Sequence, residues 1–359
     1  MNKVVITLAI IAVISVTAII VYKPDITVIL PPIENFNVGV NYATISWHYD
    51  KNQAPDWVLD RDFEIFKESK IKIITICPHW ASIESSLGVY DEQVISDYKR
   101  VIDRAKSFDI HVIIDFHITA HLTTTSDPDG SYSVPSWVKD YSPDGWHNEE
   151  TLFRSTIARQ AWITMLNHVI TSFSSCTNIH SIQILNEPYI GSWALRSQYV
   201  TSDSFLDLAQ EAKTAIKSIR NVPVTVRYAI DGLYTSWMDN ERTYQICDYM
   251  SINWYGTEMY SAHTPEKLTE VVAKAKQHGK VVFISECGYK SNDDTLQVQK
   301  FRVALDFFKS LNVSYALGWI WYGTLGSGGQ LGEGWALNSY IDGTPRSAFD
   351  IIKEYNGVT

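Results

Sequence analysis

The sequence predicts a single eight-stranded parallel α/β barrel, preceded by an N-terminal transmembrane or signal-anchor helix. Three observations predict this class. The chain has 359 residues, 45% hydrophobic and 19% charged, so it can bury one large core and is not disordered or a coiled coil. Short apolar, β-branched segments alternate with amphipathic helical patterns, as in parallel βαβ units. Residues 4–21 form an apolar segment without a charge.

The N-terminal segment is the first element. Residues 4–21 lie between Lys3 and Lys23 and are just long enough to cross the hydrocarbon core as a helix. No clear small-residue cleavage site follows, so we expect an uncleaved anchor over residues 1–23, with a cleaved signal peptide as the alternative. Residues 24–37 contain three prolines and are typical of a short stiff spacer. The remaining domain would be held outside the cell, or secreted if the segment is cleaved.

Eight predicted strands follow within residues 38–359, which form the barrel domain. They occupy residues 38–42, 71–76, 111–116, 181–185, 222–228, 249–253, 281–285 and 314–320. Helical patterns with charges on one face separate most of them, for example at 91–107, 205–220, 265–278 and 295–311. Right-handed crossovers close eight such strands into a barrel. A doubly wound open sheet is the alternative, but no glycine-rich phosphate turn follows the first strand.

Two connections are much longer than the others, at 118–150 and 321–345. Both follow strands, and barrel enzymes build their sites at the C-terminal ends of the strands. The first connection carries Trp137. The chain has 12 Trp and 20 Tyr, and most Trp residues fall at strand ends or in the following loops. Aromatic rings in such positions stack on sugar faces, so we predict an oligosaccharide or polysaccharide substrate.

The charge and the cysteines restrict the partners. The net charge of −10 argues against nucleic acid, because phosphate binding needs clustered basic residues. The four cysteines, Cys77, Cys176, Cys247 and Cys287, have no metal-binding spacing, so we expect no metal and no organic cofactor. Export would permit disulfides, but the sequence does not pair these residues. No protein partner is evident.

Two glutamates carry the chemistry. Glu187 follows the fourth predicted strand in Asn186-Glu187-Pro188, and Glu286 ends the seventh in Ser285-Glu286-Cys287. Each carboxylate should lie at the rim of the barrel and point into the cleft. A carboxylate pair across a cleft is what glycoside hydrolysis requires, with one acid for the leaving oxygen and one nucleophile. The alternative is that each glutamate merely pairs with a barrel arginine or lysine.

These motifs resemble glycoside hydrolase family 5, the cellulase and β-mannanase family of clan A. Asn186-Glu187-Pro188 is similar to the acid/base motif of that family, and Glu286 in Phe-Ile-Ser-Glu-Cys-Gly to its nucleophile strand. The segments 80–91 and 112–117, the latter ending Asp115-Phe116-His117, are similar as well, and the resemblance runs from about residue 38 to 350. It implies a retaining β-glycosidase.

The resemblance also implies roles for single residues. Glu187 would be the acid/base, Glu286 the nucleophile, and Asn186 would bind the sugar 2-hydroxyl. His117 would line the subsite beside the scissile bond, and Tyr255 would hydrogen-bond Glu286. Either Trp321 or, as second choice, Trp319 would form the stacking platform, because strand alternation would point both the same way. Each assignment competes with a structural role: a satisfied rim histidine for His117 and a packed aromatic for Tyr255.

The sequence departs from the family at one charge. The family usually carries an arginine near the end of strand two, where this chain has Ile76 and Cys77. We therefore expect uncharged or weakly charged donors to hold the nucleophile, with Tyr255 as first choice and Asn253 and His79 as further candidates. The strand-six histidine of the family is Asn253 here. These differences leave the substrate open among β-1,4-glucan, mannan and xylan.

The predicted activity is endo-acting hydrolysis of β-1,4-linked glucan or mannan through a two-glutamate double displacement. An exo-acting β-glycosidase is the alternative within the same class, favoured if the long loop after His117 closes one end of the cleft. A catalytically silent barrel that binds carbohydrate at the cell surface is the alternative from another class. The presence of both glutamates argues against it.

Overall fold

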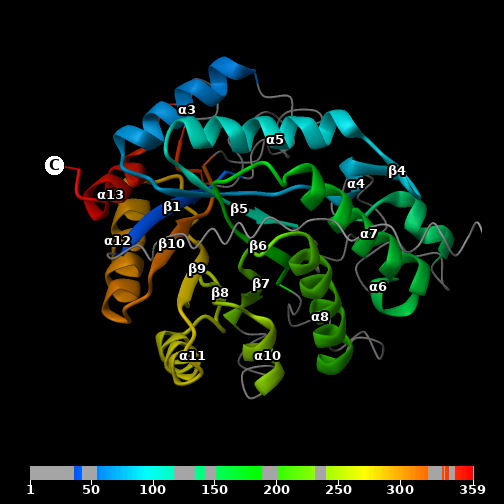
Figure 1. Cartoon of the computed structure of the whole chain (residues 1–359). Coiled ribbons are helices and arrows are strands. Elements are labelled where there is room, and N and C mark those ends of the chain that lie inside the picture. The colour runs from blue at the N-terminus through cyan, green and yellow to red at the C-terminus, as the bar shows by residue number, and fades with distance from the viewer. Residues whose placement is uncertain are drawn as a thin grey trace, which may run out of the picture.

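The structure is a computed structural model that describes residues 36–42, 55–116, 134–141, 151–187, 201–230, 240–321, 334, 336–338 and 344–358. The barrel strands are β1 (Asn37–Asn41), β2 (Ile73–Ile76), β5 (His111–Asp115), β6 (Ile179–Asn186), β7 (Val224–Ala229), β8 (Met250–Asn253), β9 (Val282–Cys287) and β10 (Tyr315–Gly318). They form a closed parallel barrel in the order β1-β10-β9-β8-β7-β6-β5-β2 (Figure 1). Since β1 pairs with both β2 and β10, the sheet has no open edge, and the predicted (β/α)8 barrel is confirmed.

All eight predicted strands overlap an observed strand, with ends that differ by a few residues. The difference that matters for the site is at β6, which extends to Asn186, so that Glu187 is the first residue beyond it. At β9 the strand extends through Glu286 to Cys287. Parallel strands in a barrel end at one face, so both glutamates lie at the C-terminal face.

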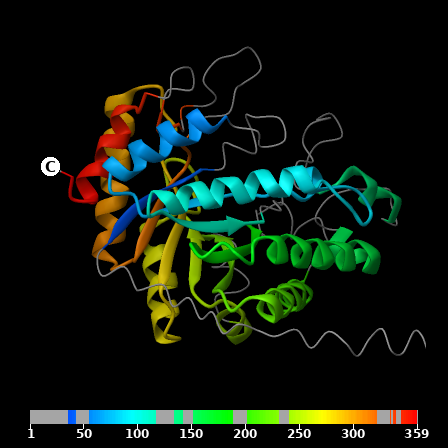
Figure 2. The same ribbon diagram turned by 45° about the horizontal axis from the view of Figure 1, so that its top comes forward.

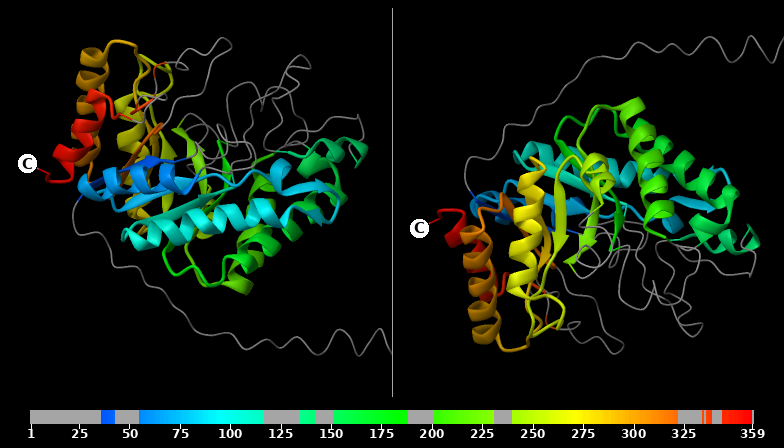
Figure 3. Two further views of the ribbon diagram at one scale, coloured as in Figure 1. Left: turned by 90° about the horizontal axis from the view of Figure 1, so that it is seen from above. Right: turned by 90° about the horizontal axis from the view of Figure 1, so that it is seen from below.

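Helices surround the barrel as a ring. They are α3 (Asp56–Glu68), α5 (Glu92–Ser107), α7 (Thr156–Ser172), α8 (Ser202–Ile219), α10 (Glu241–Ile246), α11 (Pro265–Gln277), α12 (Asp294–Ser310) and α13 (Ser347–Tyr355). Figure 2 shows α3 and α5 side by side on one flank, and Figure 3 shows the C-terminal helix α13 against α12. The ring buries the outer faces of the strands in one continuous apolar cluster.

Side-chain caps explain where several of these helices begin. The Asp91 carboxylate accepts hydrogen bonds from the first free N–H groups of α5, and the Asp293 carboxylate does the same for α12. The Thr264 hydroxyl accepts from Lys267 N before α11, whose first residue is Pro265. Such caps satisfy backbone donors that have no partner inside the helix.

Short elements lie at the rim, where the sequence suggested none. After β2 come α4 (Trp80–Ile83) and a hairpin of β3 (Glu84–Ser86) and β4 (Val89–Tyr90). A 3-10 helix, η2 (Ser136–Tyr141), and α6 (Thr151–Arg154) stand between β5 and α7. η2 carries Trp137, whose Nε1 donates to the Glu84 carbonyl (2.9 Å), so the two rim elements are joined.

The barrel interior is layered by polarity. One apolar cluster inside the barrel consists of Ile73, Ile113, Tyr249, Phe283, Tyr315 and Leu317. Toward the C-terminal ends of the strands the inward residues become polar and are still buried: Asn41, Asp115, Gln183, Arg227, Ser251, Asn253 and Ser285. Barrel interiors are usually filled by branched apolar side chains, whereas the polar residues of this layer are buried and hydrogen-bond to one another.

The predicted N-terminal helix and most of the predicted spacer lie outside the described residues. Among the helices of the described ranges, none combines the length and apolar character that crossing a bilayer requires. Cys77, Cys176, Cys247 and Cys287 are all free and buried, so none of them forms a disulfide.

Candidate active site

Glu187 stands at the end of β6 in a strained backbone conformation. Its φ is +43°, a region that non-glycine residues adopt at an energetic cost and that is enriched at functional sites. The conformation is fixed by Glu187 N, which donates to the Arg227 carbonyl of β7 (2.7 Å). The side chain is half-buried, and its Oε1 accepts from Asn253 Nδ2 (2.8 Å). Glu187 is thus both anchored and open to a ligand.

Glu286 is more enclosed, with 5% of its surface exposed. Its Oε1 forms an ion pair with Arg227 Nη2 (2.6 Å). Its Oε2 accepts a short hydrogen bond from the Tyr255 hydroxyl. Within the described residues, these two groups make the contacts of the carboxylate. An ion pair to one oxygen and a hydrogen bond to the other fix the orientation of the carboxylate at the rim of the barrel.

The contact between Tyr255 and Glu286 confirms the prediction made for Tyr255. Burial is the largest cause that raises the pKa of the Tyr255 phenol well above its ordinary value, followed by the negative charges of Glu286 and Glu187. The phenol therefore stays protonated and remains a donor. Its backbone N–H donates to His263 Nδ1 (3.0 Å), which fixes the start of the loop after β8.

Arg227 overturns the expectation that the nucleophile lacks an arginine. Strand β7 supplies it instead of β2, and its guanidinium is fully buried. Besides Glu286, it pairs with Asp115 (Nη1–Oδ2, 2.5 Å) and donates to Asn41 Oδ1 (2.9 Å) and Asn253 Oδ1 (3.1 Å). Burial by itself lowers the pKa of Arg227, but the attraction of Glu286 and Asp115 outweighs burial and leaves the pKa raised.

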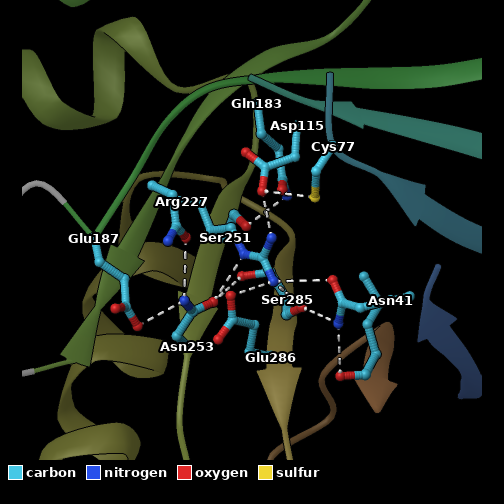
Figure 4. A network of polar contacts seen from close by, with 12 residues as sticks. Asn41, Cys77, Asp115, Gln183, Glu187, Arg227, Ser251, Asn253, Ser285 and Glu286 are labelled. Carbon is cyan, nitrogen blue, oxygen red and sulfur yellow. Dashed lines mark hydrogen bonds and ion pairs between the residues drawn. The ribbon is translucent and has the colours of Figure 1, made fainter. Parts of the chain in front are cut away.

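Asn253 has a different role from the predicted one. Its Nδ2 donates to Glu187 and to Asn186 Oδ1 (3.3 Å), and its Oδ1 accepts from Arg227 Nε and from Ser285 Oγ (2.8 Å). The amide oxygen accepts from two donors, which directs the amide nitrogen toward Glu187. Figure 4 shows Asn253 between the carboxylates of Glu187 and Glu286. Asn253 therefore joins Glu187 to Arg227, which in turn pairs with Glu286.

The other predicted donor, His79, does not contact Glu286. It precedes α4, and its backbone N–H lies 3.4 Å from the Tyr98 hydroxyl. Asn186 is buried at the end of β6 beside Asn253, at the rim position from which the predicted contact to a sugar hydroxyl would be made. His117 lies outside the described residues.

Of the two predicted platform tryptophans, the structure favours the second choice. Trp321 is fully buried and packs edge-on against Phe66 (4.7 Å between ring centroids) and Phe349 (5.0 Å), so it cannot present a face to a sugar. Trp319 is half-buried, and its ring lies 5.8 Å from Arg227 Cζ, next to the carboxylate network. The expectation that both rings point the same way is wrong, because β10 ends at Gly318 and strand alternation stops there.

Trp137 is also mainly a packing residue. Its ring packs edge-on against Trp80 (5.7 Å) and Tyr141 (5.9 Å), and its indole N–H is bonded to the Glu84 carbonyl. With 9% of its surface exposed, it offers little face to a substrate. The packing does not support the predicted substrate contact.

Sequence reasoning missed Arg227, Asn41 and the role of Asp115. One signal for Arg227 was available: it is the single charge in the predicted strand 222–228, and a buried strand carries a charge only with a partner. In the described part of the chain, no group of three His, Cys, Asp or Glu side chains could hold a metal ion.

The comparisons with known proteins point to one family. A family model described as "Cellulase (glycosyl hydrolase family 5)" matches residues 34–324. Two curated tomato (Solanum lycopersicum) proteins, mannan endo-1,4-beta-mannosidase 5 and 2, are each 22% identical over 187 residues, 48% of this chain. The match spans 42% of the length of these relatives.

Solved structures share the fold at low identity. GH5_18 from Streptomyces cattleya, in complex with GlcNAc, has a TM-score of 0.71 at 12% identity and covers 89% of this chain and 79% of its own. The exo-beta-1,4-mannosidase Op5Man5 from Opitutaceae bacterium strain TAV5 has a TM-score of 0.69 at 14% identity. The match covers 89% of this chain and 59% of Op5Man5. The endo-beta-1,4-mannanase from Thermotoga petrophila has a TM-score of 0.66 at 15% identity. The match covers 90% of this chain and 76% of the mannanase.

Proposed function

The chain belongs to glycosyl hydrolase family 5, and from this premise we propose that it is a retaining β-glycosidase that cleaves β-1,4-linked mannan or glucan. Glu187 is the acid/base and Glu286 the nucleophile. The proposal rests on the difference between the partners of the two carboxylates. Glu286 forms an ion pair with Arg227 and accepts a hydrogen bond from Tyr255, whereas Glu187 accepts a hydrogen bond from the neutral amide of Asn253. Two carboxylates in unlike environments are suited to two roles.

The proposed reaction has two displacements. In the first, a Glu286 oxygen attacks the anomeric carbon as the bond to the leaving oxygen breaks, and Glu187 gives that oxygen its proton. In the second, Glu187 takes a proton from water, the water oxygen attacks the anomeric carbon, and the ester to Glu286 breaks. Tyr255 and Arg227 hold the Glu286 carboxylate in place for attack. They stabilise its negative charge again when the sugar is released.

We propose mannan as the first substrate to test. The curated relatives are named as endo-mannosidases, and the solved neighbours include both an endo-mannanase and an exo-mannosidase. Product analysis on mannan, glucan and xylan separates the two modes. A ladder of oligosaccharides means endo action, and a single released monosaccharide means exo action. The alternative of a silent binding barrel predicts binding without products.

The nucleophile assignment is tested by chemical rescue. Glu286→Ala should abolish turnover of an activated aryl glycoside, and added azide should partly restore it with a glycosyl azide of inverted configuration. Glu187→Ala with azide should give the azide of retained configuration. An inverted azide from Glu187→Ala would reverse the two roles.

We propose that residues 4–21 keep the enzyme on a membrane, with the barrel outside the cell. The support is the uncharged apolar length of the segment between Lys3 and Lys23. N-terminal sequencing of protein from the native host tests this. A mature sequence that begins after Tyr22 would mean a secreted enzyme.

A further inference from the structure

We propose that Asp115 is a positioning residue that keeps Arg227 paired while Glu286 is bound covalently to the sugar. Arg227 then has two carboxylate partners, one permanent and one that loses its charge in each catalytic cycle. The inference rests on the proposed function only for its catalytic consequence. The pairing itself is a property of the fold.

The geometry places both carboxylates on one guanidinium. Asp115 and Arg227 are fully buried and lie on β5 and β7, while Glu286 lies on β9. Asp115 Oδ2 is 2.5 Å from Nη1 of Arg227, and Glu286 Oε1 is 2.6 Å from its Nη2. The two anions thus occupy different nitrogens of the fork and do not compete for one hydrogen (Figure 4).

The surrounding residues hold this arrangement rigidly. Arg227 Nη2 also donates to Asn41 Oδ1 on β1 and to the Ser285 carbonyl on β9, both at 2.9 Å. Asn41 Nδ2 donates to the same Ser285 carbonyl (2.9 Å). Strands β1, β5, β7 and β9 alternate around the barrel, as in the layers of an ordinary barrel core. Here one layer is an ion cluster.

The charge balance of this layer changes during the proposed reaction. In the free enzyme, one cation faces two carboxylates. When Glu286 becomes a glycosyl ester it is neutral, and Arg227 is then balanced by Asp115 alone. Without Asp115, the ester would leave a fully buried guanidinium without a counter-ion, which is strongly unfavourable. Asp115 therefore stabilises the covalent intermediate relative to the free enzyme.

The neighbouring titratable groups do not replace Asp115. The Cys77 thiol lies 3.8 Å from Asp115 Oδ2, and burial and then Asp115 raise its pKa well above the ordinary value, so it stays neutral. The Tyr255 phenol stays protonated as well. Among the described residues, the remaining carboxylate that faces the site is Glu187, which is bound through Asn253 and serves as acid/base.

The first test is a stability cycle that needs no activity. Asp115→Asn and Glu286→Gln each remove one charge and leave Arg227 the other partner, so each single variant should fold and shift the urea midpoint modestly. The double variant leaves the guanidinium unpaired, and its midpoint shift should clearly exceed the sum of the two single shifts. Additive shifts, or a single variant that does not fold, would overturn the proposal.

The second test is kinetic. In Asp115→Asn, Arg227 binds Glu286 alone, which favours the ionised carboxylate but makes it a poorer nucleophile. The acidic limb of the profile of kcat/KM against pH, measured on an activated aryl glycoside, should shift to lower pH by roughly one unit. The glycosylation rate in a stopped-flow burst should fall about tenfold. An unmoved limb together with a rate within twofold of wild type would overturn the proposal.

Two variants of Cys77 serve as controls. Cys77→Ser exchanges one neutral group for another beside Asp115 and should leave the acidic limb in place. Cys77→Asp combined with Asp115→Asn returns a carboxylate to the adjacent position and should move the limb back toward wild type. If no variant turns over any β-glycoside, the proposed function fails, and the stability cycle still decides the pairing.

Discussion

Tyr255 joins Glu286 to the loop after β8 through two different atoms. Its hydroxyl donates to Glu286, and its backbone N–H donates to His263. A charge-assisted hydrogen bond contributes roughly 1.5–3 kcal/mol, and most of it is lost when the hydroxyl is removed. We expect Tyr255→Phe to slow the glycosylation step about tenfold or more and to shift the acidic limb of the pH–rate profile to higher pH. Unchanged rate and limb would contradict this role.

His263 acts on the same tyrosine from the backbone side. Burial, and to a smaller degree the charge of Lys267, lowers the pKa of His263 to about 4, so the ring is neutral and its Nδ1 can accept. We expect His263→Leu to lower kcat several-fold with little change in KM, because Tyr255 loses its backbone anchor. His263→Asn, which restores an acceptor, should recover most of kcat. Equal activity of the two variants would argue against the anchor.

The two tryptophans after β10 should affect different properties: Trp319 substrate binding and Trp321 the stability of the fold. Trp319→Ala should raise KM at least tenfold with a small effect on unfolding, because its half-buried ring lies beside the carboxylate network. Trp321→Ala should cost about 3–5 kcal/mol of unfolding free energy, because it removes a fully buried ring from the core. Urea unfolding and steady-state kinetics of both variants check the assignment, and a reversed pattern would restore Trp321 as the platform.

Among single residues, the sequence predicted the two glutamates and the hydrogen bond from Tyr255 to Glu286, and it missed Arg227 and the partners of Arg227. Glu187, Glu286 and Tyr255 follow apolar strand patterns and motifs, which are local signals. Arg227, which pairs with Glu286, comes from β7, and its own partners Asp115 and Asn41 come from β5 and β1, so these groups meet only because the barrel closes. Which inward residue reaches across a barrel depends on register and side-chain length, and neither is encoded in a local pattern.

Strand β1 is held closely against β2 at a position without a side chain. A Cβ on Gly39 would lie 2.2 Å from the Ile73 carbonyl oxygen, and backbone cannot yield as a flexible side chain can. We expect Gly39→Ala to lower the unfolding free energy by about 3 kcal/mol. Gly279→Asn is the control, because that site is open and asparagine tolerates its φ of +68°. Loss of about 1 kcal/mol or less at Gly39 would contradict the close packing.

The elements themselves were predicted unevenly. Long periodic segments such as α5, α8, α11 and α12 were recognised because one face is apolar and the other charged. The hairpin β3–β4 and the short helices α4, α6 and η2 were not. These elements depend on tertiary contacts, such as the bond from Trp137 to the Glu84 carbonyl, and are too short for a periodic signal.

The molecule as a whole encloses a polar layer within an otherwise apolar barrel. Eight alternating strands and helices made the closed barrel predictable, since few other topologies satisfy right-handed crossovers. The polar layer was not predictable as a unit, because its members are spread from Asn41 to Glu286. A cluster of this kind stabilises little by itself, because desolvation offsets much of the attraction between the charges. It sets the geometry of the site.

The same enclosed interior makes the fold sensitive to acid through a histidine. His180, at the start of β6, lies among the rings of Tyr249, Phe283 and Tyr315, with centroids at 6.3, 5.5 and 5.8 Å. Burial, and then the nearby His111, lowers its pKa to about 4. A histidine in the unfolded chain has a pKa near 6.5. Between about pH 6.5 and pH 4, His180 is therefore protonated in the unfolded chain and neutral in the folded chain. The contribution of neutral His180 is therefore complete above about pH 6.5 and is lost as the pH falls toward 4.

The lowered pKa of His180 predicts how the stability of the whole protein depends on pH. The unfolding free energy of the wild type should fall as the pH drops from about 6.5 to 4, with His180 alone contributing on the order of 2 kcal/mol. His180→Leu cannot take up the proton, so its stability should decline less over the same interval, by about that amount. Urea unfolding of both proteins at several pH values measures the difference, since the carboxylates titrate in both and cancel. If the unfolding free energies of wild type and His180→Leu fell in parallel with pH, the protonated ring would be tolerated among Tyr249, Phe283 and Tyr315. The inference that burial keeps His180 neutral would then be wrong.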